Sequence, residues 1–212
     1  MRAKRQAVVI SRQMGSGGSY IGLAVAKELG FRYVDREILR EAAQRLATDE
    51  ELLMDREERP AGIIQNLLRT ISLGVPDAYI VPMGRPVYNK DLYVLERTIM
   101  NDIVDHYSAV IMGRGGYLAL KDRPEVVSVF IHAGLEFRIK RVMDTMNITD
   151  PKKARGKVEE SDRRRVRFAR DILGVNWTDA RNFHLSIDSG VTGFAASAEM
   201  IVRLVHEKGR SA

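Results

Sequence analysis

The sequence predicts an α/β fold in which about five parallel strands form a doubly wound sheet with helices on both faces. Three observations support this. The apolar run Val8-Val9-Ile10 leads into a glycine-rich loop and then an amphipathic helix, which is how a parallel α/β sheet commonly opens. Short apolar runs then alternate with helical patterns along the chain. A length of 212 residues, without internal repeats, fits one domain.

Each strand is expected where a short apolar run ends in a turn signal, and these runs cover residues 6–11, 31–34, 109–112, 126–131 and 183–187. Helices are expected where apolar residues recur every three or four positions, over residues 19–29, 36–46, 91–107, 135–146, 158–173 and 193–206. In the first helix Ile21, Val25 and Leu29 form the apolar face, and Gly30 ends it. Between the second and third helices lies a charged helical stretch, followed by a loop with three prolines.

Composition indicates a protein that binds a small polyanion. The net charge is +6 and the pI about 9.6, so a phosphorylated partner is expected. Aromatic residues make up only 7%, and no basic run is interleaved with aromatics, which disfavours nucleic acid. No cysteine is present and no apolar run approaches the length of a membrane span, so we expect a cytoplasmic protein without a membrane contact.

The glycine loop after the first strand is the strongest functional signal. Its backbone N–H groups and the following helix N-terminus can hold phosphate oxygens, and the expected phosphate-binding residues are Gly15, Ser16, Gly17, Gly18 and Ser19. Against the pattern G-x-x-x-x-G-K-[ST], Gly17 and Ser19 match, Arg12 replaces the first glycine and Gly18 replaces the lysine. Arg12 could supply the missing charge, and the Ser19 hydroxyl is a candidate Mg²⁺ ligand. A glycine turn that serves helix packing alone is the alternative.

Several motifs in order resemble the cytidylate kinase-like family, a relative of bacterial cytidylate kinases. They are Ile10-Ser11-Arg12-Gln13, Gly15-Ser16-Gly17-Gly18, Ile21-Gly22, Tyr33-Val34-Asp35, Gly113-Arg114-Gly115, Phe130-Ile131, Asp162-Arg163-Arg164-Arg165 and the tail from Trp177 to Asp188. The resemblance covers most of the chain and is weakest over residues 55–89. It implies a P-loop kinase fold with a mobile helical lid, and Mg²⁺-ATP-dependent phosphorylation of a nucleoside monophosphate, first of all CMP or dCMP. A loop without the lysine fits this family.

The resemblance also places an acceptor site. It implies that residues 1–212 form one domain, with 48–90 as a helical insertion on the acceptor side and 147–170 as the lid. Asp162 and Arg165 take the position of an Asp and an Arg that contact the acceptor nucleotide, and Arg114 would bind its phosphate. The related kinases have an Asp after this arginine, where Gly115 stands here. That departure bears on metal handling and on base specificity.

Further charged residues are candidates from their positions. Arg163 and Arg167 share one face of the basic helix, and we assign them with Arg12 to catalysis, because phosphoryl transfer needs cations around its oxygens. Arg138 and Arg141, on the helix entering the lid, are candidate acceptor contacts. Asp35 ends the second strand and could contact the acceptor or hold Mg²⁺ through water; a helix N-cap is its alternative role.

Two other functions stay open. One is a kinase of a different small acceptor, whose pocket the weakly matched middle segment would shape. The other is a nucleotide-binding sensor with little turnover, which the missing lysine and Gly115 favour. A nucleic-acid-binding protein is a more distant alternative, and the four histidines show no metal-binding spacing. A homodimer is possible through the helix at 91–107.

Overall fold

The computed structural model describes residues 5–35, 39, 90–113 and 115–210. The insertion expected at 48–90, nearly all of the helix expected at 36–46, and Arg114 lie outside the described residues. Within the described ranges, no helix combines the length and the hydropathy that a membrane crossing requires.

Five strands form one parallel sheet in the order β2-β3-β1-β4-β5. The strands are β1 (Ala7–Arg12), β2 (Arg32–Val34), β3 (Ala109–Met112), β4 (Val126–His132) and β5 (Leu185–Asp188). In the centre, Val9 of β1 pairs with Ile111 of β3 on one side and with Ser128 of β4 on the other. The sheet confirms the predicted fold class, and β3 has the predicted bounds.

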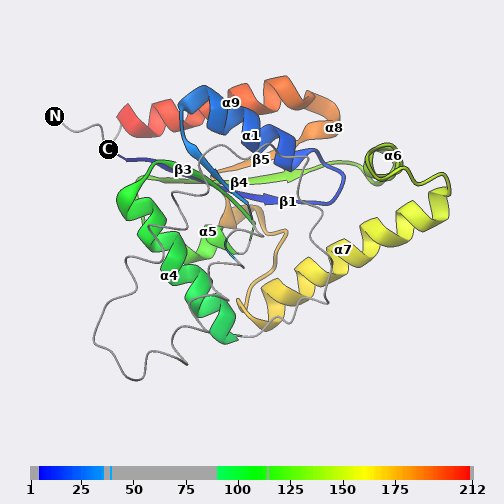
Figure 1. Cartoon of the computed structure of the whole chain (residues 1–212), viewed down its shortest axis with the longest axis horizontal. Helices are drawn as coiled ribbons and strands as arrows, with labels where there is room; N and C mark the ends of the chain where they lie inside the picture. The colour runs from blue at the N-terminus through cyan, green and yellow to red at the C-terminus, as the bar shows by residue number, and fades with distance from the viewer. Residues whose placement is uncertain (1–4, 36–38, 40–89, 114, 211–212) are drawn as a thin grey trace.

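Helices cover both faces of the sheet, which explains why its central strands are apolar throughout. Figure 1 shows α1 and α9 on one face and α4 and α5 on the other. Val8 and Ile10 of β1 pack in the cluster with α1 and α9, whereas Ala7 and Val9 pack in the cluster with α4 and α5. Alternate side chains of β1 therefore contribute to two separate hydrophobic cores, one on each face of the sheet.

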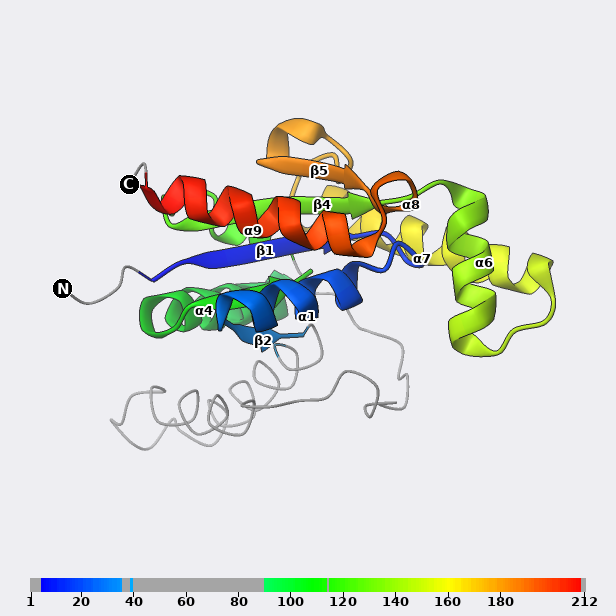
Figure 2. The ribbon, with the colours of Figure 1, turned by 90° about the horizontal axis from the view of Figure 1, so that it is seen from above.

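The helices are α1 (Gly18–Leu29), α4 (Lys90–His106), α5 (Gly116–Ala119), α6 (Leu135–Met146), α7 (Pro151–Asp171), η1 (Ala180–Asn182), α8 (Ser189–Thr192) and α9 (Phe194–Arg210). Gly17 and Gly30 cap α1 at its two ends, both with a left-handed backbone that favours glycine. Seen from above in Figure 2, α6 and the start of α7 extend beyond the ends of the strands. These two helices pack on each other through Ile139, Val142, Ala154 and Val158.

The predicted start of the basic helix at residue 158 was wrong. The helix α7 begins at Pro151, seven residues before the predicted start, and the connection from α6 is short. Asp150 caps α7, since its side chain accepts a hydrogen bond of 2.8 Å from the backbone N–H of Lys152. Proline at the first helical position has no N–H to leave unpaired, so Pro151 is well suited to begin this helix.

Candidate functional site

The glycine loop after β1 has a backbone that only glycine adopts without strain. Gly15 has φ +82° and Gly17 has φ +74°. Neighbours also leave no room for a side chain: a Cβ on Gly15 would lie 2.6 Å from the carbonyl oxygen of Arg138, and a Cβ on Gly17 would lie 2.5 Å from the ring of Phe194. The loop is thus packed between α6 and α9.

Hydrogen bonds fix the loop from both sides. Gln13 donates from its backbone N–H to Ile131 over 3.0 Å, and the Ser16 hydroxyl donates to the carbonyl of Gln13 over 2.9 Å. The buried hydroxyl of Ser189 in turn donates to the carbonyl of Ser16 over 2.6 Å. Gly17 offers no side-chain cap to α1, so the first N–H groups of this helix stay available to an anion. Backbone N–H groups held in this arrangement can donate hydrogen bonds to the oxygens of a phosphate.

Arg12 lies across the position where a P-loop carries its lysine. It is the last residue of β1, and its Cβ would be 2.7 Å from a Cβ built on Gly18. Its guanidinium extends to the end of β3, where Nη1 would lie 3.3 Å from a Cβ on Gly113. Within the described ranges Arg12 forms no ion pair or hydrogen bond, so its charge is available to a ligand between the loop and β3.

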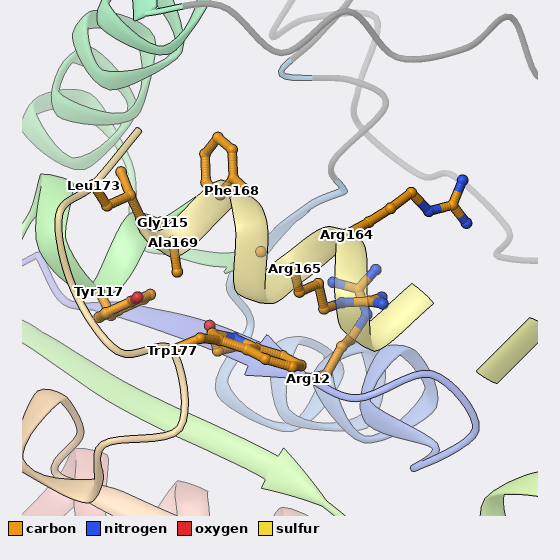
Figure 3. A pocket seen from close by; sticks show the side chains of 11 residues that line it. Arg12, Gly115, Tyr117, Arg164, Arg165, Phe168, Ala169, Leu173 and Trp177 are labelled. Carbon is orange, nitrogen blue, oxygen red and sulfur yellow. The ribbon is translucent and has the colours of Figure 1, made fainter. Parts of the chain in front are cut away.

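A pocket opens at the carboxyl ends of β1 and β3. The chain leaves β1 toward α1 on one face and leaves β3 toward α5 on the other, so this point is the crevice where ligands bind in open α/β sheets. The pocket encloses about 70 Å³. Its lining is Ser11, Arg12, Gly113, Gly115, Tyr117, Arg164, Arg165, Phe168, Ala169, Leu173 and Trp177 (Figure 3).

One end of the pocket is cationic. Figure 3 shows the side chains of Arg12 and Arg165 directed toward the same end, and both line the cavity. Arg165 donates to the carbonyl of Ser161 over 3.1 Å and to its hydroxyl, which holds the guanidinium in place. Arg164 is half-exposed and pairs with Glu160 over 3.6 Å. Arginines gathered around one small cavity suit a phosphate group, whose oxygens accept from their N–H forks.

The other end is aromatic. Tyr117 and Phe168 line it, and Trp177 lies between the two ends (Figure 3), 5.9 Å from the guanidinium of Arg165 and edge-on against Phe130 with ring centroids 5.4 Å apart. Tyr117 is 4% exposed, and its hydroxyl finds no hydrogen-bond partner in the described part of the chain. Burial raises the pKa of Tyr117 to about 12, with a further contribution from Tyr93, so this hydroxyl stays a proton donor.

The structure separates the two arginines assigned to catalysis from the pocket. Arg163 and Arg167 are exposed, and Arg163 lies 3.8 Å from Glu159 on the outer face of α7. The inner face carries Ser161, Arg165 and Ala169 at four-residue spacing. The small residues Ser161 and Ala169 could have identified the inner face of α7 from the sequence. The spacing of the arginines alone indicated the face that the structure exposes to solvent. Arg164 and Arg165 are the arginines of α7 that line the pocket.

Three further candidates, Arg138, Asp162 and Arg141, are not among the residues that line the pocket. Arg138 is buried and pairs with Asp162, Nη1 to Oδ2, at 2.8 Å. The guanidinium of Arg141 lies 4.4 Å above the ring of Phe194, on the α9 side of the sheet. Arg114 lies outside the described residues, but its neighbours Gly113 and Gly115 both line the pocket.

The two candidate magnesium contacts flank one tyrosine. The hydroxyl of Tyr33 lies 3.3 Å from Oδ2 of Asp35 and 3.5 Å from the carbonyl of Ser19. Burial, followed by the nearby carboxylate of Asp35, raises the pKa of Tyr33 to about 12. No group of three or more acidic or histidine side chains gathers within the described ranges. Two oxygen-bearing residues fit Mg²⁺, which usually takes its remaining ligands from water and substrate phosphates.

Comparison with known proteins agrees with the fold. A sequence profile of the Cytidylate kinase-like family matches residues 7–191. No curated protein matches the chain significantly. Among solved structures, an uncharacterized protein from Eubacterium ventriosum has a TM-score of 0.70 and 19% identity, covering 95% of this chain and 99% of that one.

Two named kinases share the fold at lower similarity. A shikimate kinase from Bacteroides thetaiotaomicron has a TM-score of 0.50 and 12% identity, covering 95% of this chain and 98% of its own. A gluconokinase from Sinorhizobium meliloti has a TM-score of 0.51 and 13% identity, with 97% of each chain covered. At these identities the likeness shows the fold alone. The profile match over most of the chain shows more: this protein belongs to the Cytidylate kinase-like family and has the fold of the P-loop small-molecule kinases.

Proposed function

We propose that the protein transfers the γ-phosphoryl group of Mg²⁺-ATP to a nucleoside monophosphate, with CMP or dCMP as the first candidates. The observation that carries this proposal is the position of Arg12. Its side chain crosses Gly18 and reaches Gly113, so a guanidinium without an ion-pair partner among the described residues lies between the glycine loop and the pocket. A charge at that place can contact both the transferred group and the group that receives it.

In this proposal the loop holds the donor. Backbone N–H groups from Gly15 to Ser19 bind the donor phosphates, and Arg12 replaces the absent lysine. Mg²⁺ would neutralise phosphate charge beside Ser19 and Asp35. Its coordination would be completed by water and the phosphates.

The cationic end of the pocket holds the acceptor. Arg165, with Arg164 beside it, binds the acceptor phosphate and neutralises its charge. An oxygen of that phosphate attacks the γ-phosphorus, and the bond from the γ-phosphorus to the bridging oxygen of ADP breaks. The protein supplies position and positive charge, which is most of what phosphoryl transfer requires.

The size of the pocket indicates which part of the acceptor it takes. A volume of about 70 Å³ admits a phosphate group, whereas sites for whole small ligands typically measure about 300–1,000 Å³. We therefore propose that the lid expected at residues 147–170 opens to admit the acceptor and closes on its phosphate.

A different acceptor is the second candidate, and one observation favours it. Gly115 lines the pocket where the related kinases carry an Asp, and the described lining contains no carboxylate or amide side chain to read a base. A nucleotide sensor with little turnover is the third, because Arg12 reaches the lysine's place from a different backbone position.

A coupled assay of ADP release, run with Mg²⁺-ATP and a panel of nucleoside monophosphates, separates the three. Turnover with CMP or dCMP supports the proposal, and turnover only with another acceptor supports the second candidate. Binding of ATP without turnover on any acceptor supports the sensor. Absence of ATP binding would refute the assignment of the loop.

A further inference from the structure

Arg138 connects three segments that are far apart in the sequence. Its Nε donates to the carbonyl of Ala133 over 3.0 Å, just after β4, and its Nη1 donates to Oδ2 of Asp162 in α7 over 2.8 Å. The same Nη1 lies 3.5 Å from the carbonyl of Met14 in the glycine loop. The residue is 6% exposed, so little water competes for these contacts.

The glycine loop packs directly on this residue. A Cβ on Gly15 would lie 2.6 Å from the carbonyl oxygen of Arg138 and 2.9 Å from its Cα. The two backbones therefore pack so closely that no side chain fits between them. Next to it, the side chain of Met14 packs into the apolar cluster between α6 and α7. A shift of the α6–α7 pair therefore displaces the loop, and the reverse holds as well.

Asp162 links Arg138 to the part of α7 that lines the pocket. It precedes Arg165 by three residues, which is nearly one turn of α7, and Arg165 lines the cationic end. The second carboxylate oxygen of Asp162, Oδ1, is buried and has no hydrogen-bond partner in the described part of the chain. The pair with Arg138 is thus the polar contact that the described structure gives this carboxylate.

We propose that Arg138 and Asp162 form a latch, meaning an ion pair, buried on the Arg138 side, that holds the turn of α7 carrying Arg165 against the glycine loop. A nucleotide bound in the loop restricts the position of α6 through Arg138. Asp162 then holds the turn of α7 so that Arg165 is positioned to bind the acceptor phosphate. Both residues become positioning residues rather than the acceptor contacts that the sequence suggested. The identity of the two ligands rests on the proposed function, whereas the mechanical link does not.

Hydrogen exchange on the ligand-free protein tests the link. Asp162→Asn removes the charge that faces Arg138 and keeps the shape of the side chain. We expect amides of the loop and amides of α7 around Arg165 to exchange together, each about threefold faster or more, because both depend on one contact. Unchanged exchange in the loop, with faster exchange in α7 alone, would overturn the latch.

Arg155→Gln is the matched control. Arg155 of α7 pairs with Glu136 of α6 at 2.6 Å, so it joins the same two helices, but both partners are exposed and neither contacts the loop. This variant should leave loop exchange at the wild-type rate. Arg138→Lys is the second test variant if Asp162→Asn does not fold: it keeps a cation beside Asp162 and loses the guanidinium fork, and the same two regions must respond.

A binding measurement separates positioning from general damage. In the wild type we expect CMP to tighten ATP binding about tenfold, within the usual range for coupled sites. Asp162→Asn should reduce this ratio below about twofold, and Arg155→Gln should keep it. General damage would weaken both ligands and preserve the ratio, which would refute the latch. A linked exchange response without binding of either nucleotide would instead refute the proposed function and leave the latch standing.

Discussion

We propose that Arg12, which lies over Gly18, takes the place of a phosphate-binding lysine, and moving the charge from one position to the other tests this proposal. Truncation in Arg12→Ala removes charge-assisted hydrogen bonds to phosphate, each worth about 1.5–3 kcal/mol. Loss of one such bond weakens ATP binding roughly 10- to 150-fold. Gly18→Lys alone should not tighten ATP binding, because its Cβ would lie 2.7 Å from Cβ and 2.9 Å from Cδ of Arg12. Such overpacking costs about 1–3 kcal/mol of stability.

The double variant Arg12→Gly/Gly18→Lys removes this overlap, because glycine carries no Cβ, and returns a cation to the loop. We expect it to bind ATP at least about tenfold more tightly than Arg12→Gly, since one charge-assisted bond is regained. Calorimetric titration with Mg²⁺-ATP measures the affinities, and thermal unfolding verifies that each variant is folded. Wild-type affinity in folded Arg12→Ala, or no gain in the double variant, would refute the reasoning.

Two other variants follow from a buried hydroxyl and from a histidine whose pKa is lowered. Tyr117→Phe removes a buried hydroxyl without a partner in the described structure, so the free energy of unfolding should rise by about 1 kcal/mol. If this hydroxyl binds the acceptor, CMP affinity should fall by roughly 2- to 12-fold in the same variant, and a titration that shows no loss contradicts that role. Burial, followed by nearby Lys208, lowers the pKa of His184, and its Nδ1 accepts from the backbone N–H of Ser128 over 3.0 Å. The folded state therefore binds fewer protons than the unfolded state, and stability is present above the unfolded pKa of about 6.5 and is lost as pH falls through the folded value. Urea unfolding from pH 7.5 to 5 should show this loss, and His184→Gln should show less of it; equal slopes would contradict the assignment.

Local patterns were sufficient for most of the fold. The apolar run at Ala109–Met112 and the amphipathic pattern at Leu135–Met146 have the bounds that the sequence predicted. Both signals are periodicities within one segment, which the sequence contains in full. The start of α7 was missed because a proline can either end a helix or begin one. Which of the two Pro151 does depends on the N-cap that Asp150 provides.

The site was less predictable because its contacts join distant segments. Arg138 and Asp162 are 24 positions apart, and nothing local to either shows that they pair in the interior. The face of α7 that turns toward the pocket depends on packing against the sheet, so charge spacing favoured Arg163 over Arg165. The position of Arg12 over Gly18 could be proposed from the motif, since both residues lie in one loop and the missing lysine required a substitute.

The central claim is that the loop and the pocket act together on two phosphorylated ligands. ³¹P NMR of the protein with Mg²⁺-ATP and CMP tests it most directly, because it detects both products at once. We predict that ADP and CDP appear in equal amounts and that neither appears when CMP is omitted. Formation of ADP without a phosphorylated acceptor, or no reaction with any nucleoside monophosphate, would contradict it.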